Sequence, residues 1–410
     1  MKSILDFYGR VASDEHPVVA YTFFVSAILL FIYTSVFLTY TYLFRELDRI
    51  SAKAQLPTLG CKTLLLVFAL LYSPVFTVHR DIKIREAVWH NTALLSLTVF
   101  SGICILFKPK KERVCLSSTR HTIFFQSLGT LSSPLLGVYY ILSSYGSTFL
   151  FTIYAFYSVI FIQKGKNNDI QVFPAEDDRQ TVLKTVFDNV LVGSEERNRR
   201  PWLSILTSSL AMGNLVYYTF LEKRYPSQIL CIVLFCLGAS VSLKSKKHKW
   251  FKNAYTFLCT CILLKSISEK FYMLLLSTSP GMINTPAGYI MLNTLRLAFP
   301  VLVVVSTGVG MGRYKLCFSL AISITIHIFL FQKALIMLLR EEVYQLVLLD
   351  RTTMYSLVFT IISTMLLFIN NEIRSGLFET EVGVLLIVLF LLYIMCLLGH
   401  STPSKFNINE

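Results

Sequence analysis

Long apolar stretches alternate with short polar segments along almost the whole chain. A helix needs about 20 mostly apolar residues to cross the hydrocarbon core of a bilayer. By that measure the first half of the chain predicts five spanning helices: Val18–Phe44, Thr63–His79, Ala87–Phe107, His121–Leu142 and Ser147–Gln163. The second half predicts seven: Trp202–Leu221, Ser227–Leu243, Trp250–Ser277, Ala287–Thr307, Lys315–Leu339, Thr352–Asn370 and Val382–Leu398. The pattern therefore predicts an all-α protein, a polytopic transmembrane bundle of about twelve helices.

One long polar segment, residues 164–201, separates two membrane regions. Its mixed acids and bases predict a loop with a small amphipathic helix around Thr181–Val192, which fits either a linker or a regulatory element. The chain then divides into a first membrane unit, the loop, a transmembrane hairpin and a second membrane unit: 1–163, 164–201, 202–243 and 244–410.

The first five and the last five predicted helices begin at similar intervals, and each set begins with a long helix. An odd number of crossings separates the two first helices, so the second set enters the membrane from the opposite side. Inverted repeats are common in secondary transporters, whose substrate site lies near the midplane where the repeats meet. We therefore expect two inverted five-helix repeats plus an extra hairpin.

Charge placement adds a topology to this picture. The net charge is +14, but the lysines and arginines lie mainly in short loops between apolar stretches, which argues against a nucleic-acid partner. Most are in loops on the same side as residues 164–201, so the positive-inside rule places this loop in the cytosol and both termini on the non-cytosolic side. Only 15% of the residues are charged, against about 25% in soluble proteins, so we expect the lipid bilayer to solvate much of the surface.

Arg296 is the clearest candidate for function, because ionisable residues in the middle of a span are costly. Asn293 and Thr294 flank it. The run Thr285-Pro286-Ala287-Gly288 and then Pro300 predict a weakened or broken helix with free backbone groups for a solute. Glu269 offers the second unit a carboxylate for a cation. Two interpretations stay open: Arg296 and Glu269 belong to a substrate site, or they form a buried structural ion pair.

Several other polar residues have less specific explanations. Lys265 lies one turn before Glu269, so a local pair within one helix is sufficient for both. Ser73, next to Pro74, marks a predicted kink with a free hydroxyl and is a candidate ligand. His327 fits either packing or proton relay, and Lys333 fits a side chain that extends to the membrane interface.

No motif of a soluble enzyme occurs, and we expect neither catalytic residues nor a cofactor. The nine cysteines form no Cys-x-x-Cys pair, so neither a metal site nor a disulfide framework is indicated. A lipid- or glycan-modifying membrane enzyme would need a cluster of acids or histidines at a membrane boundary, and the sequence offers none.

The layout resembles the membrane region of the cation/calcium exchanger superfamily, most of all its mitochondrial-type sodium/calcium exchangers. Phe23–Ser51 looks like the family's long first helix running into a polar, aromatic-rich segment. Thr98-Val-Phe-Ser-Gly-Ile-Cys-Ile-Leu-Phe107 is similar to the glycine-containing second half of its first repeat. Tyr145–Tyr157 looks like the helix before its cytosolic loop, and Gly288–Thr294 resembles its second repeat.

The resemblance implies an exchanger fold, with Asn293 and Thr294 on the family's Asn-Ser. Family members bind Ca²⁺ and Na⁺ with a carboxylate in each repeat, which suits hard cations. Here Leu297 stands at the second acidic position, with Arg296 beside it.

We therefore expect a secondary transporter of cations, an antiporter like the sodium/calcium exchangers, that works by alternating access with degenerate ion-binding motifs. Arg296 would replace one bound cation or attract an anion, and Asn293, Thr294 and Ser73 would be neutral ligands. The alternative is a non-transporting membrane scaffold that keeps the fold and uses its loop.

Overall fold

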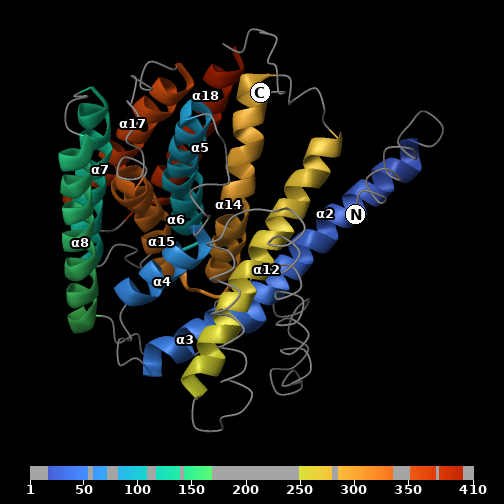
Figure 1. Ribbon diagram of the computed structural model, residues 1–410, viewed down its shortest axis with the longest axis horizontal. Coiled ribbons are helices and arrows are strands. Elements are labelled where there is room, and N and C mark those ends of the chain that lie inside the picture. The colour runs from blue at the N-terminus through green and yellow to red at the C-terminus, as the bar shows by residue number, and fades with distance from the viewer. Residues whose placement is uncertain are drawn as a thin grey trace.

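The structure is a computed structural model that describes nine ranges of the chain. These are residues 17–53, 59–71, 82–108, 117–138, 143–168, 249–278, 285–335, 351–374 and 378–399. Every regular element within these ranges is a helix, as the apolar pattern predicts (Figure 1).

Five continuous helices lie in the first half of the described chain. They are α2–η1–α3 (Pro17–Leu38, Thr39–Leu43, Phe44–Lys53), α4 (Leu59–Leu71), α5–η2–α6 (Ile82–Leu95, Ser96–Phe100, Ser101–Leu106), α7 (Ser117–Val138) and α8 (Ser143–Asn168). The second half has α12 (Lys249–Thr278), α14 (Pro286–Gly310), α15–η4 (Tyr314–Ile326, His327–Gln332), α17 (Arg351–Arg374) and α18 (Thr380–Gly399). The segments labelled η are π-helical turns.

These ten helices match ten of the predicted spans, and seven of them are long and apolar enough to cross a membrane. The predicted hairpin 202–243 and most of the loop 164–201 lie outside the described residues, although α8 continues through the loop's first residues to Asn168.

The predicted end of the first helix at Phe44 is wrong, because the helix continues to Lys53. Its extension α3 buries Phe44, Leu47 and Ile50 on one face and exposes Arg45 on the other. This amphipathic spacing allows a helix to continue beyond an apolar span along the surface of the bundle.

Two helices form the centre of the bundle. α15–η4 is buried on all sides, and α5–η2–α6 is nearly so. The peripheral helices expose large apolar side chains instead, such as Leu29, Ile373 and Met395. Apolar residues that face outward along entire helices are the arrangement that a lipid environment favours.

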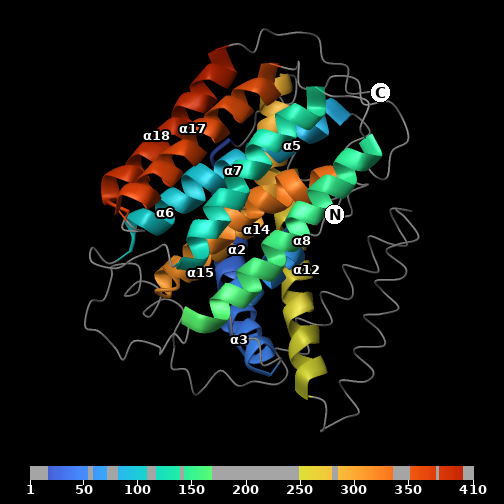
Figure 2. The same ribbon diagram turned by 90° about the vertical axis from the view of Figure 1, so that its left-hand side faces the viewer.

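The remaining helices surround this centre in matching sets. α7 and α8 lie together on one side, as α17 and α18 do on another, while the long helices α2 and α12 cross at the opposite edge from α8 (Figures 1 and 2). The contacts also recur in pairs: α4 contacts α15 as α5 contacts α14, and α7 contacts α15 as α17 contacts α5. Number the helices of each half from one to five. If every helix is exchanged for the helix with the same number in the other half, the first contact of each pair becomes the second.

Two helices from opposite halves approach closely at glycines. A Cβ atom on Gly102 of α6 would lie 2.9 Å from the carbonyl oxygen of Gly383 on α18 and 2.9 Å from Cγ1 of Ile387. Small residues at such a crossing let helix backbones pack together in lipid, where no hydrophobic effect drives association.

We expect Gly102→Leu to lower the free energy of unfolding by about 1–3 kcal/mol, because the new side chain forces α6 and α18 apart. Thermal unfolding of the purified protein in detergent would measure this loss. Gly399→Leu is the matched control, since no atom lies within 4 Å of a Cβ added at Gly399. Equal midpoints for the two variants would contradict the close approach.

Candidate functional site

The predicted site helix, α14, begins with a well-formed cap. The Thr285 Oγ1 accepts a hydrogen bond from the Gly288 backbone N–H at 3.2 Å, and Pro286 occupies the first helical turn. Proline is favoured there because the first N–H groups of a helix have no partner within the helix. Thr285 and Pro286, which were expected to disrupt this helix, instead cap it and begin it.

The expectation of a broken helix at Pro300 is also wrong, because α14 continues from Pro286 to Gly310. A proline inside a helix has no N–H, so the carbonyl four residues earlier loses its donor. That carbonyl belongs to Arg296, and the Ser268 hydroxyl of α12 donates to it at 2.5 Å. A side chain of the neighbouring helix therefore replaces the missing donor and keeps α14 continuous.

The Arg296 side chain binds the same neighbouring helix. Its Nε lies 2.7 Å from Oε1 of Glu269, and its Nη2 lies 2.6 Å from Oε2. The guanidinium also lies over the Tyr272 ring, 5.1 Å from the centroid. The ion pair anticipated as one of two interpretations is thus present, in the two-bond geometry that makes arginine–carboxylate pairs strong.

Asn293 and Thr294 are both almost fully buried on α14. The Thr294 hydroxyl donates to the Ile290 carbonyl at 2.8 Å, so it bonds its own helix. The Asn293 Nδ2 donates to the Tyr289 carbonyl at 2.9 Å, whereas its Oδ1 has no hydrogen-bond partner among the described residues. Of the predicted neutral ligands, Asn293 therefore has a buried oxygen without a hydrogen-bond partner among the described residues, and Ser73 lies outside them.

A second set of polar contacts joins the two central helices directly. The Ser96 hydroxyl donates to the Ala321 carbonyl at 2.9 Å, and the Thr325 hydroxyl donates to the Ala93 carbonyl at 3.3 Å. Each helix has a π-turn at a similar distance from its start, η2 in the first and η4 in the second. Such turns are frequent at functional sites, because they re-aim side chains within a continuous helix.

Tyrosines from the fifth helix of each half contact these central helices. The Tyr157 hydroxyl of α8 lies 2.7 Å from the Ser323 hydroxyl of α15. The Tyr393 hydroxyl of α18 donates to Oδ1 of Asn91 on α5. The two contacts correspond to each other: each joins the fifth helix of one half to the third helix of the other half.

His327 begins η4 and is almost fully buried. Its Nδ1 lies 2.9 Å from the Tyr154 hydroxyl, its Nε2 lies 3.2 Å from the Gln332 Nε2, and the Phe331 ring stacks on it with centroids 4.8 Å apart. These contacts support the packing interpretation of this residue.

Sequence reasoning missed Glu86, because the third span was predicted to begin one residue later. The helix begins at Ile82, so Glu86 lies within it, and its side chain is buried. Lys333 of the other central helix interacts electrostatically with it, so Lys333 has an acidic neighbour instead of only extending to the interface.

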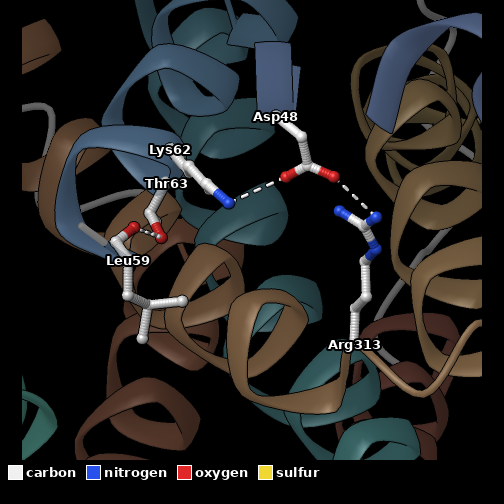
Figure 3. Close-up of polar contacts among 5 residues, drawn as sticks. All are labelled: Asp48, Leu59, Lys62, Thr63 and Arg313. Carbon is white, nitrogen blue, oxygen red and sulfur yellow. Dashed lines mark hydrogen bonds and ion pairs between the residues drawn. The ribbon is translucent and has the colours of Figure 1, made fainter. Parts of the chain in front are cut away.

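Sequence reasoning also missed an ion-pair cluster around Asp48, because the first helix was predicted to end before it. Asp48 lies on α3, where one carboxylate oxygen is 2.8 Å from Lys62 of α4 and the other is 2.7 Å from Arg313 (Figure 3). Arg313 lies between α14 and α15, and its guanidinium also stacks on Phe44 at 5.0 Å. One carboxylate thereby connects both halves of the chain.

We expect Asp48→Asn to lower the free energy of unfolding by about 1–3 kcal/mol, because Lys62 and Arg313 then lose their shared counter-charge in a half-buried position. Thermal unfolding in detergent would measure the change. Glu381→Gln, at an exposed acid, is the control and should change stability by less than about 0.5 kcal/mol. A loss no larger than the control's would show that the cluster adds nothing to stability.

We also expect Ser268→Ala to cost about 1 kcal/mol, since the Arg296 carbonyl is left without a donor. In a Pro300→Ala background the same change should cost less, because the alanine N–H can bond that carbonyl. A double-mutant cycle on unfolding free energies would measure the coupling. Additive effects of the two substitutions would argue against the compensation.

Comparison with known proteins identifies the fold. The chain is similar to the crystal structure of an H⁺/Ca²⁺ exchanger, CAX, with a TM-score of 0.50 and 13% sequence identity, over 97% of this chain and 93% of that one. No protein-family model and no curated protein sequence matches it. At this identity the likeness concerns the fold alone: the chain is a multi-pass membrane protein with a cation/calcium exchanger-like fold.

Proposed function

We propose that this chain is a secondary transporter of small inorganic cations, which it moves by alternating access between two inverted five-helix units. The observation that carries the proposal is the central crossing, where Ser96 and Thr325 each donate from one buried helix to a backbone carbonyl of the other. The exchanger-like fold and the paired helix contacts support the same assignment.

In a protein built from an inverted repeat, such a crossing lies where the two units meet. Two equivalent units of opposite orientation can exchange conformations, so that a site between them opens first to one side and then to the other. The tyrosine contacts Tyr157–Ser323 and Tyr393–Asn91 fit equivalent roles in the two units. The proposal includes a cytosolic loop at 164–201 and non-cytosolic termini, which the distribution of basic residues supports.

The substrate site of this proposal is formed by Asn293, Arg296 and Glu269, with Thr294 and Ser73 as further candidate ligands. Arg296 lies ten residues after the start of α14, and at 1.5 Å per residue this is about 15 Å along the helix. The hydrocarbon core is about 30 Å thick, so this depth corresponds to the midplane. The likeness to an H⁺/Ca²⁺ exchanger and the sequence resemblance to sodium/calcium exchangers support cations as the cargo.

One observation favours the alternative, a non-transporting scaffold. Both oxygens of Glu269 accept hydrogen bonds from Arg296, and the guanidinium charge repels a metal ion while the pair is closed. A scaffold would keep this pair permanently as structure, whereas a transporter must open it during its cycle.

Flux measurements on the full-length protein in liposomes separate the two functions. We expect uptake of at least one of ²²Na⁺, ⁸⁶Rb⁺, ⁴⁵Ca²⁺ or protons above that of protein-free liposomes, and loss of this uptake in Arg296→Ala under the same conditions. The matched control is Lys315→Ala, a base outside the proposed site. No uptake of any of the four ions would reject the cation-transport proposal and favour the scaffold.

A further inference from the structure

Four acids among the described residues face bases of the protein. Glu269 is bound by Arg296, Asp48 by Lys62 and Arg313, and Glu46 by Arg49, while Glu86 has Lys333 as its electrostatic partner. No group of three or more acids, histidines or cysteines that could hold a metal ion occurs in the part of the chain that the structure describes. A cation that binds here must therefore compete with a base that is part of the protein.

The competition is best defined at Glu269, where one guanidinium occupies both carboxylate oxygens. The side chains of Arg296 and Glu269 are 22% and 24% exposed, so neighbouring helices enclose the pair only in part. The Arg296 backbone is separately fixed by the bond from Ser268. The side chain can consequently leave the carboxylate by rotating its own bonds, without a change in the packing of α14.

The charge of an ion decides whether it can replace the Arg296 guanidinium on the Glu269 carboxylate. At the Glu269 carboxylate, one monovalent cation replaces the charge of the guanidinium one for one. A divalent ion would instead add one uncompensated positive charge in a low-dielectric region, which is costly. The unpartnered Oδ1 of Asn293, one turn before Arg296, is a neutral oxygen ligand of the kind that cations use.

We infer that Arg296 is a tethered cation that alternates with a single monovalent cation on Glu269. This inference rests on the proposed transport function and specifies its cargo. When the cargo leaves, the guanidinium refills the site, so the protein returns across its cycle with its charge balanced. Transport of the monovalent cation then needs no counter-ion, in contrast to the antiport that the sequence resemblance implies.

Flux through liposomes with choline as the only cation on the opposite side tests the tether, with a protonophore to dissipate the membrane potential. We expect ²²Na⁺ or ⁸⁶Rb⁺ uptake by the unmodified protein under these conditions, and little ⁴⁵Ca²⁺ uptake. Arg296→Gln should slow the uptake about tenfold or more, with recovery when Na⁺ or K⁺ replaces choline on the opposite side. Arg296→Lys, which keeps a tethered charge, should stay independent of the opposite cation.

A requirement for an opposite cation in the unmodified protein, or ⁴⁵Ca²⁺ uptake as fast as that of the monovalent ions, would overturn the inference and leave the transport function standing. Absence of all flux would reject the transport function itself. The two failures are therefore distinguishable.

Thermal unfolding in detergent gives a readout that does not depend on flux. In Arg296→Gln the exposed carboxylate should bind Na⁺ or K⁺, so the midpoint should rise by about 2 °C or more relative to choline chloride at equal ionic strength. The double variant Glu269→Gln/Arg296→Gln is the matched control, because it pairs two neutral amides and should show no such rise. Equal responses of the single and double variants would overturn the tether even if transport were found.

Discussion

A membrane interior offers no water to backbone groups, so each carbonyl and N–H must find a partner within the protein. The irregular points of this bundle all follow that constraint. Pro300 deprives the Arg296 carbonyl of its helical donor, and the Ser268 hydroxyl supplies another from the adjacent helix. At the centre, Ser96 and Thr325 donate across the two π-containing helices to backbone carbonyls. A side-chain hydroxyl thus compensates the irregular point at Pro300, and two others connect the central helices.

The same low-dielectric setting explains the distribution of charge. An isolated ion in the bundle would be expensive, so the acids within it that are described here have bases beside them, as at Asp48 and Glu269. Asp48 joins α3, α4 and the connection before α15, while Glu269 joins α12 to α14. In both cases a carboxylate on the first helix of a unit meets a base on the second helix of that unit. Removing one partner would leave a half-buried charge uncompensated, which ties the conformation of these helices to their ion pairs.

These two constraints together distinguish this bundle from one that simply binds metal ions. The fold is exchanger-like, but a guanidinium occupies the carboxylate of Glu269. The fold likeness concerns the arrangement of the helices, whereas the charges beside Glu269 belong to this chain's own residues. A fold likeness at 13% identity carries no information about the second of these.

The order of apolar and polar residues by itself determined the helical class, the approximate places of the ten helices in the described part of the chain, and the candidates Asn293, Arg296 and Glu269, because hydrophobic length is a direct requirement of a bilayer. The sequence pattern could not determine where α3 ends or that Glu86 is buried. Both lie at amphipathic ends of helices, where apolar and polar residues alternate and hydropathy marks no boundary. Only the tertiary structure decided that Pro300 leaves α14 unbroken and that Arg296 binds Glu269, 27 residues away on another helix. Both outcomes depend on Ser268, Glu269 and their neighbours on α12, whose position beside α14 is set by packing across the bundle and not by any local pattern.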